Sequence, residues 1–447
     1  MPKDCYRFSR FGSCPFGDHC RFQHIADAGE STNNWRTDDA NASKTETHPK
    51  DARFYQPDGS SVLLVDGVLF KVQATAIFGS RPEVAPESNR KFTPMYIEDV
   101  LPRLSNSSDT HPIEVSSITK EQFRTYLLLI TGLPYDEEYI SLLVDYLTPE
   151  KHSQNLFLRY LDIATVAPRF GMSKLENWAV KALHAVFTES ANSLRQIPYE
   201  WNCNTLLQLR ELTRETDLDS SVRAFIQYLI YKIVRDIQRD QGASECSSKI
   251  TDLIDIYRGF KKSDEDNALL GCVFLNILSL GHRSQVWLKL GRYDKAILYA
   301  AQAQLTNLPN EFVPGSLAWV TKPDPELAQQ LCTGCQLRLS SLWDKLFGEC
   351  SEGLGSNVPL KDVLFLVKMP EYRWTLWNEM RQVALSVCNL GPLAPPSSPA
   401  TPRTSRIDKC SLLPLLNDID QHIRDLYEQT TSRYRAIAQE FSASALA

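Results

Sequence analysis

Four metal-ligating side chains near the N-terminus constrain the fold of this chain more than any other feature. Cys5, Cys14, Cys20 and His24 follow one another with the spacing C-x8-C-x5-C-x3-H. Three thiolates and one imidazole complete a tetrahedral zinc shell, and a shell filled by the protein is structural. About twenty residues with almost no apolar core have little to fold around except the metal, so zinc binding and folding should be one event. We predict that residues 1–26 are a zinc finger and that zinc is the cofactor.

The fourth ligand has one competitor. His19 is next to Cys20, but adjacent residues rarely close a chelate comfortably, and His24 has the better reach. We therefore predict His24 as the fourth ligand.

The segment from Cys5 to His24 resembles the CCCH zinc fingers. Aromatic residues, glycines and a proline stand between the ligands where that family has them, at Phe8, Gly12, Pro15, Phe16, Gly17 and Phe22. Fingers of this family commonly bind single-stranded RNA, so the resemblance implies that Phe16 and Phe22 stack on unpaired bases. The side chains expected to meet phosphates are Lys3, Arg7, Arg10 and Arg21.

A role in protein contact is the main alternative for this finger. One finger offers few contacts, and no basic segment precedes it. The aromatic residues would then only cover the zinc. A chance cluster of cysteines is the remaining interpretation.

Two polar stretches divide the rest of the chain. Residues 27–55 are rich in Asn, Thr, Asp and Ser and nearly free of aliphatic side chains, which predicts a disordered linker. A proline-rich stretch predicts a second linker at 389–407. A C-terminal helix is expected over 408–447. We therefore predict a multidomain, mainly α protein.

The folded middle begins with a hairpin pattern. Ser61–Val65 and Val68–Val72 have strand character and flank Asp66-Gly67, a dipeptide typical of tight turns. From Thr119, a candidate N-cap, helical periodicity takes over. The apolar run that begins at Leu269 is too short for a bilayer and contains a polar Asn, so it predicts a buried core helix and no membrane span.

Residues 58–188 resemble a BTB/POZ domain of the divergent kind abundant in fungi. The resemblance lies in the stretches 58–81, 111–132 and 157–183, and it predicts an α+β domain over 56–190. BTB domains have no catalytic residues and make protein contacts, so an adaptor or oligomerisation module is implied. Gln73 replaces a usual histidine, and the middle of the domain is lengthened. Dimerisation and cullin binding therefore stay open.

An all-α domain is predicted over 191–388. Within it, residues 277–308 resemble one tetratricopeptide hairpin, with Trp287 and Leu290 at large positions and Gly291 at the turn. A single unit of this kind must stack on neighbouring helices.

Cys332 and Cys335 form a C-x-x-C sequence. A zinc ribbon would need a second pair, and a thioredoxin-like motif would need a preceding strand and a helix that begins at the first cysteine. The sequence indicates neither context. We expect buried structural thiols, with a metal or redox role as the alternative.

The charge balance and the absence of catalytic motifs restrict the classes of function that we expect. The 48 Lys and Arg residues are balanced by 54 Asp and Glu residues, so nucleic-acid contact must be local. Neither a nucleophile elbow nor a phosphate-binding glycine loop nor an H-E-x-x-H helix is found, and we expect no enzyme. The stretch MPKDCYRFSR lacks an apolar signal region, so we expect a cytoplasmic or nuclear protein that is not secreted.

Two functional hypotheses follow. The first is an adaptor whose finger binds single-stranded RNA while the BTB-like and helical regions bind proteins or a second copy, which would raise the avidity of two weak fingers. The second is a substrate adaptor of a cullin ubiquitin ligase, in which the finger is a protein-interaction module.

Overall fold

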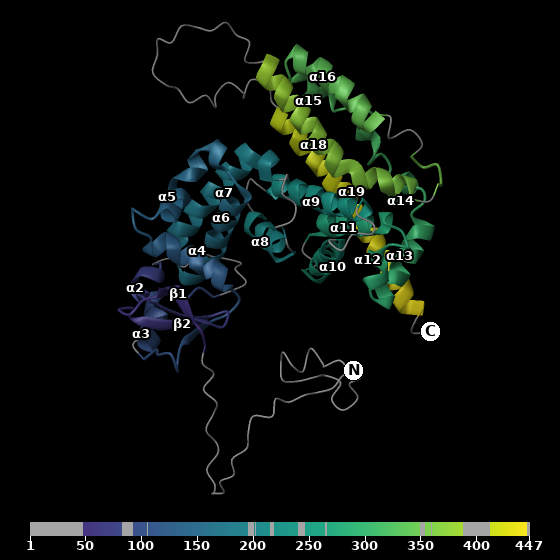
Figure 1. Cartoon of the computed structure of the whole chain (residues 1–447). Coiled ribbons are helices and arrows are strands. Elements are labelled where there is room, and N and C mark those ends of the chain that lie inside the picture. Colours follow the sequence, from purple (N-terminus) through teal and green to yellow (C-terminus); the bar gives the residue numbers. More distant parts are fainter. Residues whose placement is uncertain are drawn as a thin grey trace, which may run out of the picture. The chain divides into compact units, whose positions relative to one another are not determined.

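A computed structural model describes most of the chain from residue 48 onward (Figure 1). The described residues are 48–82, 93–104, 106–194, 201, 203–214, 219–239, 246–263, 266–348, 354–358, 360–387 and 412–444. They all belong to one structural unit, His48–Ala447. This unit is mainly helical and contains a small sheet, which agrees with the predicted mainly α class.

The sheet has the strand order β1-β3-β2-β4. Its strands are β1 (Lys50–Tyr55), β2 (Ser61–Val65), β3 (Val68–Val72) and β4 (Ile113–Val115). β2 and β3 form an antiparallel hairpin, in which Ser61 pairs with Val72 and Val65 with Val68. β4 runs parallel to β2, and β1 runs parallel to β3.

The turn of the hairpin consists of Asp66 and Gly67. Both have positive φ, 47° and 74°. A type I′ turn requires positive φ at both central residues, which is why Asp-Gly suits it. The predicted hairpin is confirmed with its predicted strand bounds.

The predicted disordered linker 27–55 is wrong at its C-terminal end, because its last six residues form β1. Asp51 accounts for much of this order. Its carboxylate accepts hydrogen bonds from the backbone N–H of Phe54 at 2.8 Å and from Nε of Arg124 at 2.7 Å. Burial opposes ionisation, but these hydrogen bonds hold the pKa of Asp51 below its usual value. Phe54 is buried as well.

Helices follow the hairpin along the chain. The first group contains α2 (Ala74–Ile77), α3 (Ile97–Leu104), α4 (Lys120–Thr131), α5 (Glu137–Val144), α6 (Gln154–Val166) and α7 (Ser173–Leu194). The second contains α8 (Cys203–Thr213), α9 (Asp219–Arg239), α10 (Cys246–Ser263), α11 (Asn267–Ser279), α12 (Gln285–Lys289) and α13 (Arg292–Gln304). The last contains α14 (Leu308–Glu311), α15 (Pro325–Gln329), α16 (Thr333–Trp343), α18 (Lys361–Val387) and α19 (Leu412–Ser444).

Short 3₁₀ and π segments connect several of these helices. They are η2 (Asp145–Leu147), η3 (Pro149–Lys151), η4 (Ala167–Phe170), η6 (Ala318–Thr321) and the π-helical η7 (Asp344–Gly348).

The start of α4 has the predicted N-cap. Thr119 Oγ1 accepts a hydrogen bond from the backbone N–H of Gln122, and Gln122 Oε1 accepts one from the backbone N–H of Thr119, at 3.2 and 3.1 Å. This reciprocal pair is a capping box. The prediction that a helix begins after Thr119 is therefore confirmed.

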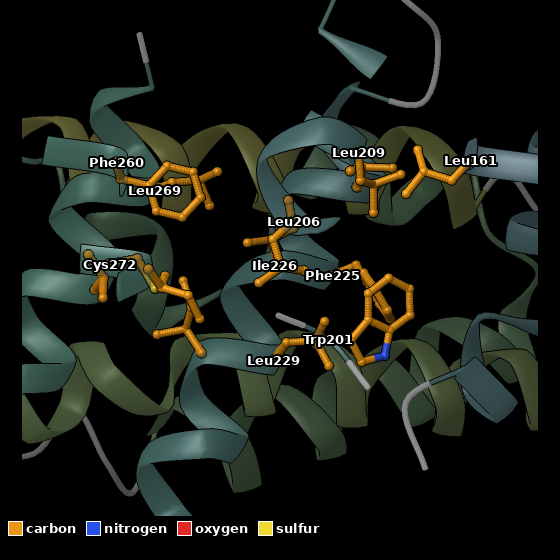
Figure 2. Packing of buried hydrophobic residues seen from close by; sticks show 14 of the residues in the cluster. Leu161, Trp201, Leu206, Leu209, Phe225, Ile226, Leu229, Phe260, Leu269 and Cys272 are labelled. Atoms are coloured by element: carbon orange, nitrogen blue, oxygen red, sulfur yellow. The ribbon is translucent and has the colours of Figure 1, made fainter. Parts of the chain in front are cut away.

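Aromatic side chains pack across the predicted domain boundary at residue 190, which lies inside α7. The ring of Phe187 in α7 lies 5.4 Å from that of Phe225 in α9. Trp201 lies 5.1 Å from Phe225 and 5.7 Å from Phe157 of α6. Figure 2 shows Trp201 beside Phe225, with buried leucines of α8 and α9 nearby. The two predicted domains on either side of this boundary therefore share one hydrophobic core.

The buried helix α11 packs directly against the C-terminal helix α19. A Cβ added to Gly271 would lie only 2.0 Å from the carbonyl oxygen of Tyr427, so the backbones approach as closely as a glycine allows. Thr431 Oγ1 also donates to the carbonyl oxygen of Asn267 at 2.6 Å. The helix predicted within 408–447 is confirmed, and it belongs to the same helical body.

Asn276 lies in the apolar run that begins at Leu269. Its side chain is fully buried, and its Nδ2 donates to the carbonyl oxygen of Cys272 at 2.9 Å. The predicted core helix is confirmed. Within the part of the chain that the structure describes, no helix is both long and apolar enough to cross a membrane.

Residues 277–308 do not form two long helices. They include the end of α11, the five-residue α12, α13 and the start of α14. Gly291 is the N-cap of α13 and lies at the predicted turn. Trp287 ties α12 to α11 by donating its Nε1–H to the carbonyl oxygen of Ile277 at 2.8 Å. The helix lengths therefore do not support the tetratricopeptide resemblance.

Candidate functional site

The residues predicted to bind zinc and RNA all lie outside the part of the chain that the structure describes. The predicted zinc ligands are Cys5, Cys14, Cys20 and His24. The predicted RNA contacts are Phe16, Phe22, Arg7, Arg10 and Arg21. Among the residues from 48 onward that are described, no group of three or more His, Cys, Asp and Glu side chains could hold a metal ion.

The segment around α5 carries exposed apolar side chains that the sequence analysis did not single out. Ile140, Val144 and Leu147 recur at helical spacing and are 39%, 43% and 66% exposed. Leu133 and Tyr135 precede α5 and are 48% and 81% exposed. We refer to these five residues as the α5 stripe. Exposed apolar residues on a monomer are normally scattered singly. Several of them gathered in one segment are typical of a contact surface.

A surface hollow of about 320 Å³ lies between α5, η3 and the start of α6. Four of the charged side chains that line it, Glu138, Asp145, Lys151 and Arg159, form ion pairs. Glu138 accepts hydrogen bonds from Arg53 at 2.7 Å and from Arg159 at 3.1 Å, and these bonds lower its pKa. Lys151 donates to Asp145 at 2.7 Å. The hollow is thus a paired, solvated surface next to the α5 stripe.

One half-buried carboxyl group lies where α4, α6 and α8 meet. Burial raises the pKa of Asp162 in α6 to about 7, although a hydrogen bond with Gln122 opposes the shift. Gln122 in turn donates its Nε2 to Oε1 of Gln208 in α8 at 3.1 Å. Sequence reasoning missed Asp162, although its neighbours Leu161 and Ile163 are apolar and buried, because a charged residue in a helix is ordinarily assigned to the solvent face.

The C-x-x-C pair occupies the start of α16. Cys332 is the N-cap of this helix and Cys335 is its third residue, so the expectation that no helix begins there is wrong. Cys335 is fully buried, as expected, and Cys332 is half-buried. No strand precedes the pair within the described residues 266–331.

Comparison with known proteins supports the metal motif at the N-terminus. The family model for the zinc finger C-x8-C-x5-C-x3-H type (and similar) matches residues 2–25. These residues are similar to CCCH zinc fingers. The match implies zinc binding, so zinc is the cofactor of this protein. The chain matches no curated protein and no solved structure.

Proposed function

We propose that this protein is a zinc-dependent adaptor that binds single-stranded RNA through residues 2–25 and other proteins through its helical body. The match of the N-terminal segment to the CCCH family carries this proposal, because fingers of this family are commonly RNA-binding. The donor set fits zinc, since three thiolates and an imidazole fill a tetrahedral shell without an open position.

The residues between the ligands suit unpaired RNA. Phe16 and Phe22 stack on bases, and Arg7, Arg10 and Arg21 neutralise phosphates. When bound, zinc supplies the cross-link around which the segment folds. One finger contacts few nucleotides, so its affinity is low and the body supplies avidity or specificity.

The architecture of the first part of the body supports the BTB-like interpretation of residues 56–190. The supporting features are the β2–β3 hairpin, the parallel pairing of β4 with β2, and the helices α4, α6 and α7 that follow. Gln73, which replaces the usual histidine, donates its Nε2 to the carbonyl oxygen of Asp58 at 2.6 Å. It therefore ties the end of β3 to the segment before β2.

The α5 stripe supports the protein-binding half of the proposal. Its exposed apolar side chains have an affinity for another apolar surface, and the paired charges of the adjoining hollow form a polar rim. A second copy of the chain and a cullin are the two partners to test. The cullin partner would make the protein a ubiquitin-ligase adaptor.

The RNA half is tested by crosslinking the full-length, zinc-loaded protein to RNA. We expect Cys14→Ser to abolish the crosslink, and Phe16→Ala with Phe22→Ala to weaken it by about tenfold or more, because base stacking contributes about 1–3 kcal/mol per base. Cys203→Ser, which changes a cysteine of the helical body, is the matched control. Equal RNA recovery with Cys14→Ser would show that the finger is not the reader.

The protein half is tested with the double variant Tyr135→Ser, Leu147→Ser. Light scattering measures self-association, and a binding assay with a purified cullin measures the alternative. We expect the variant to lose whichever contact the parent protein makes. Leu101→Ser is the control, because Leu101 is 56% exposed but lies in α3, away from the α5 stripe. If the parent protein makes neither contact, both partners are excluded.

A further inference from the structure

The two cysteines at the start of α16 lie three residues apart, one at its N-cap and one in its first turn. Cys332 is the N-cap, with φ −65° and ψ 156°, and Cys335 is the third helical residue. The C-x-x-C spacing at a helix N-terminus is the arrangement in which cysteine thiols are most readily activated. A disulfide needs Cβ atoms about 3.5–4.5 Å apart, and Cys332, with its extended backbone, is not fixed at the wider spacing of roughly 5–6 Å that two residues inside a helix would have. A small tightening of the first turn therefore brings the sulfurs into bonding range.

The intervening residues permit this tightening. Thr333 and Gly334 separate the two cysteines, and Gly334 has no side chain to obstruct a closer turn. The backbone before the helix is held in place by Gln336, whose Nε2 donates to the carbonyl oxygen of Leu331 at 2.8 Å. The N–H of Gln336 donates to the carbonyl oxygen of Cys332 at 2.9 Å. These two hydrogen bonds hold the backbone of Leu331 and Cys332 against the first turn of α16.

The two thiols differ in access. Cys335 is fully buried, whereas Cys332 is half-buried. A reactive cysteine must meet its co-reactant at the surface, and a resolving cysteine only has to reach its neighbour. The arrangement thus assigns the attacking role to Cys332 and the resolving role to Cys335.

Charge at the helix start also favours reactivity. The first turn of α16 contains no acidic side chain. The backbone N–H groups at a helix N-terminus stabilise a negative charge such as a thiolate.

Cys203 provides an internal contrast, because it is the first residue of α8 and is also half-buried. Burial, together with the nearby carboxylates of Asp255 and Asp252, raises the pKa of Cys203 to about 11. It donates its Sγ–H to the carbonyl oxygen of Asp255 at 3.2 Å. Cys203 is therefore expected to be inert, although it too lies at a helix start.

We propose that Cys332 and Cys335 form a reversible dithiol–disulfide couple that exchanges with low-molecular-weight disulfides. The Cys332 thiolate attacks one sulfur of the small disulfide, whose S–S bond breaks and releases one thiolate. Cys335 then loses its proton and attacks Cys332 Sγ in the mixed disulfide, releasing the second thiolate. Two protein thiols are oxidised, one small disulfide is reduced to two thiols, and the two protons pass to the released thiolates.

Oxidation of this pair would act on the packing of α16. The helix contacts α18 and α15, and Leu339 and Leu342 bury its inner face. Tightening the first turn shifts the end of α15 relative to that face. The couple lies in the unit His48–Ala447, outside the finger segment.

The test uses the full-length, zinc-loaded protein equilibrated in glutathione buffers from reducing to oxidising. Thiols are then alkylated and the protein is digested with trypsin. The tryptic peptide that ends at Arg338 contains Cys332 and Cys335 and no other cysteine, so its mass reports the pair alone. We expect one two-electron transition, with the pair fully disulfide-bonded in the most oxidising buffer.

Single variants separate the two roles. We expect Cys335→Ser to trap glutathione on Cys332, whereas Cys332→Ser should leave Cys335 unmodified. Cys203→Ser should leave the transition unchanged, and in the parent protein Cys332 should be alkylated at least about tenfold faster than Cys203. Circular dichroism checks that each variant is folded. A pair that stays reduced in the most oxidising buffer, or equal alkylation rates at Cys332 and Cys203, would overturn the proposal.

Discussion

The finger segment and the helical body carry their information in different ways. In residues 2–25, four side chains at set spacing carry the assignment, and the loss of one opens the metal shell. In the body, stability is distributed over buried side chains from the sheet to α19, and no single residue reveals a function. A metal site can thus be recognised from local spacing, whereas a packed body acquires its surfaces only when distant segments meet.

The largest expected effect separates the two regions. Cys14→Ser should abolish zinc binding by the finger, because structural zinc contributes about 10–16 kcal/mol to such segments. The melting temperature of the body should not change, since it folds around its own core. Zinc content and thermal unfolding measure the two effects. A melting temperature that falls together with the zinc content would show that the two regions are coupled.

A buried ion pair tests how much one contact contributes within the body. Arg373 donates from Nε and Nη2 to the carboxylate of Asp420 at 2.7 and 2.6 Å, and both side chains are buried. Asp420→Ala leaves a buried charge without its partner and should cost about 3–5 kcal/mol in the free energy of unfolding. Glu379→Ala removes the exposed pair with Arg338 and should cost less than about 1 kcal/mol. Similar losses in chemical denaturation would contradict this difference.

Asp162 gives the body a pH dependence opposite in sign to that expected of the finger, whose zinc ligands must lose their protons to bind. The folded state raises the pKa of Asp162 to about 7, so it binds the proton more tightly than the unfolded chain does. The free energy of unfolding of the parent protein should therefore decrease as the pH rises from about 4 to about 7. Asp162→Asn should match the parent near pH 4 and exceed it by at most about 4 kcal/mol at pH 8. Parallel stability curves in urea titrations would contradict this expectation.

The smallest effect concerns the close approach of α11 and α19. Gly271→Ala should destabilise the body by about 1–3 kcal/mol, because the new Cβ would clash with the carbonyl oxygen of Tyr427. Gly291→Ala is the matched control, since the nearest atom to its added Cβ is 3.8 Å away. Its cost should stay below about 1 kcal/mol. Equal melting temperatures for the two variants would show that α19 is less tightly docked than its contacts indicate.

Local signals predicted local structure well. Asp66-Gly67 predicted the hairpin turn, because few dipeptides accept two positive φ angles. Thr119 predicted the start of α4, because its hydroxyl satisfies a backbone N–H that no helical carbonyl reaches. The strand β1 was missed because its order depends on Asp51 and Arg124, which are far apart in sequence.

The sequence by itself predicted the zinc shell, since its expected ligands are close together along the chain and zinc chemistry defines their number and kind. It also determined the hairpin and the helical character of most of the remainder. Only the tertiary structure decided that the predicted boundary at residue 190 is crossed by one core, that α19 packs on α11, and that Cys332 begins a helix. These features depend on contacts between residues distant in sequence or on the exact start of a helix, and neither is encoded in local periodicity.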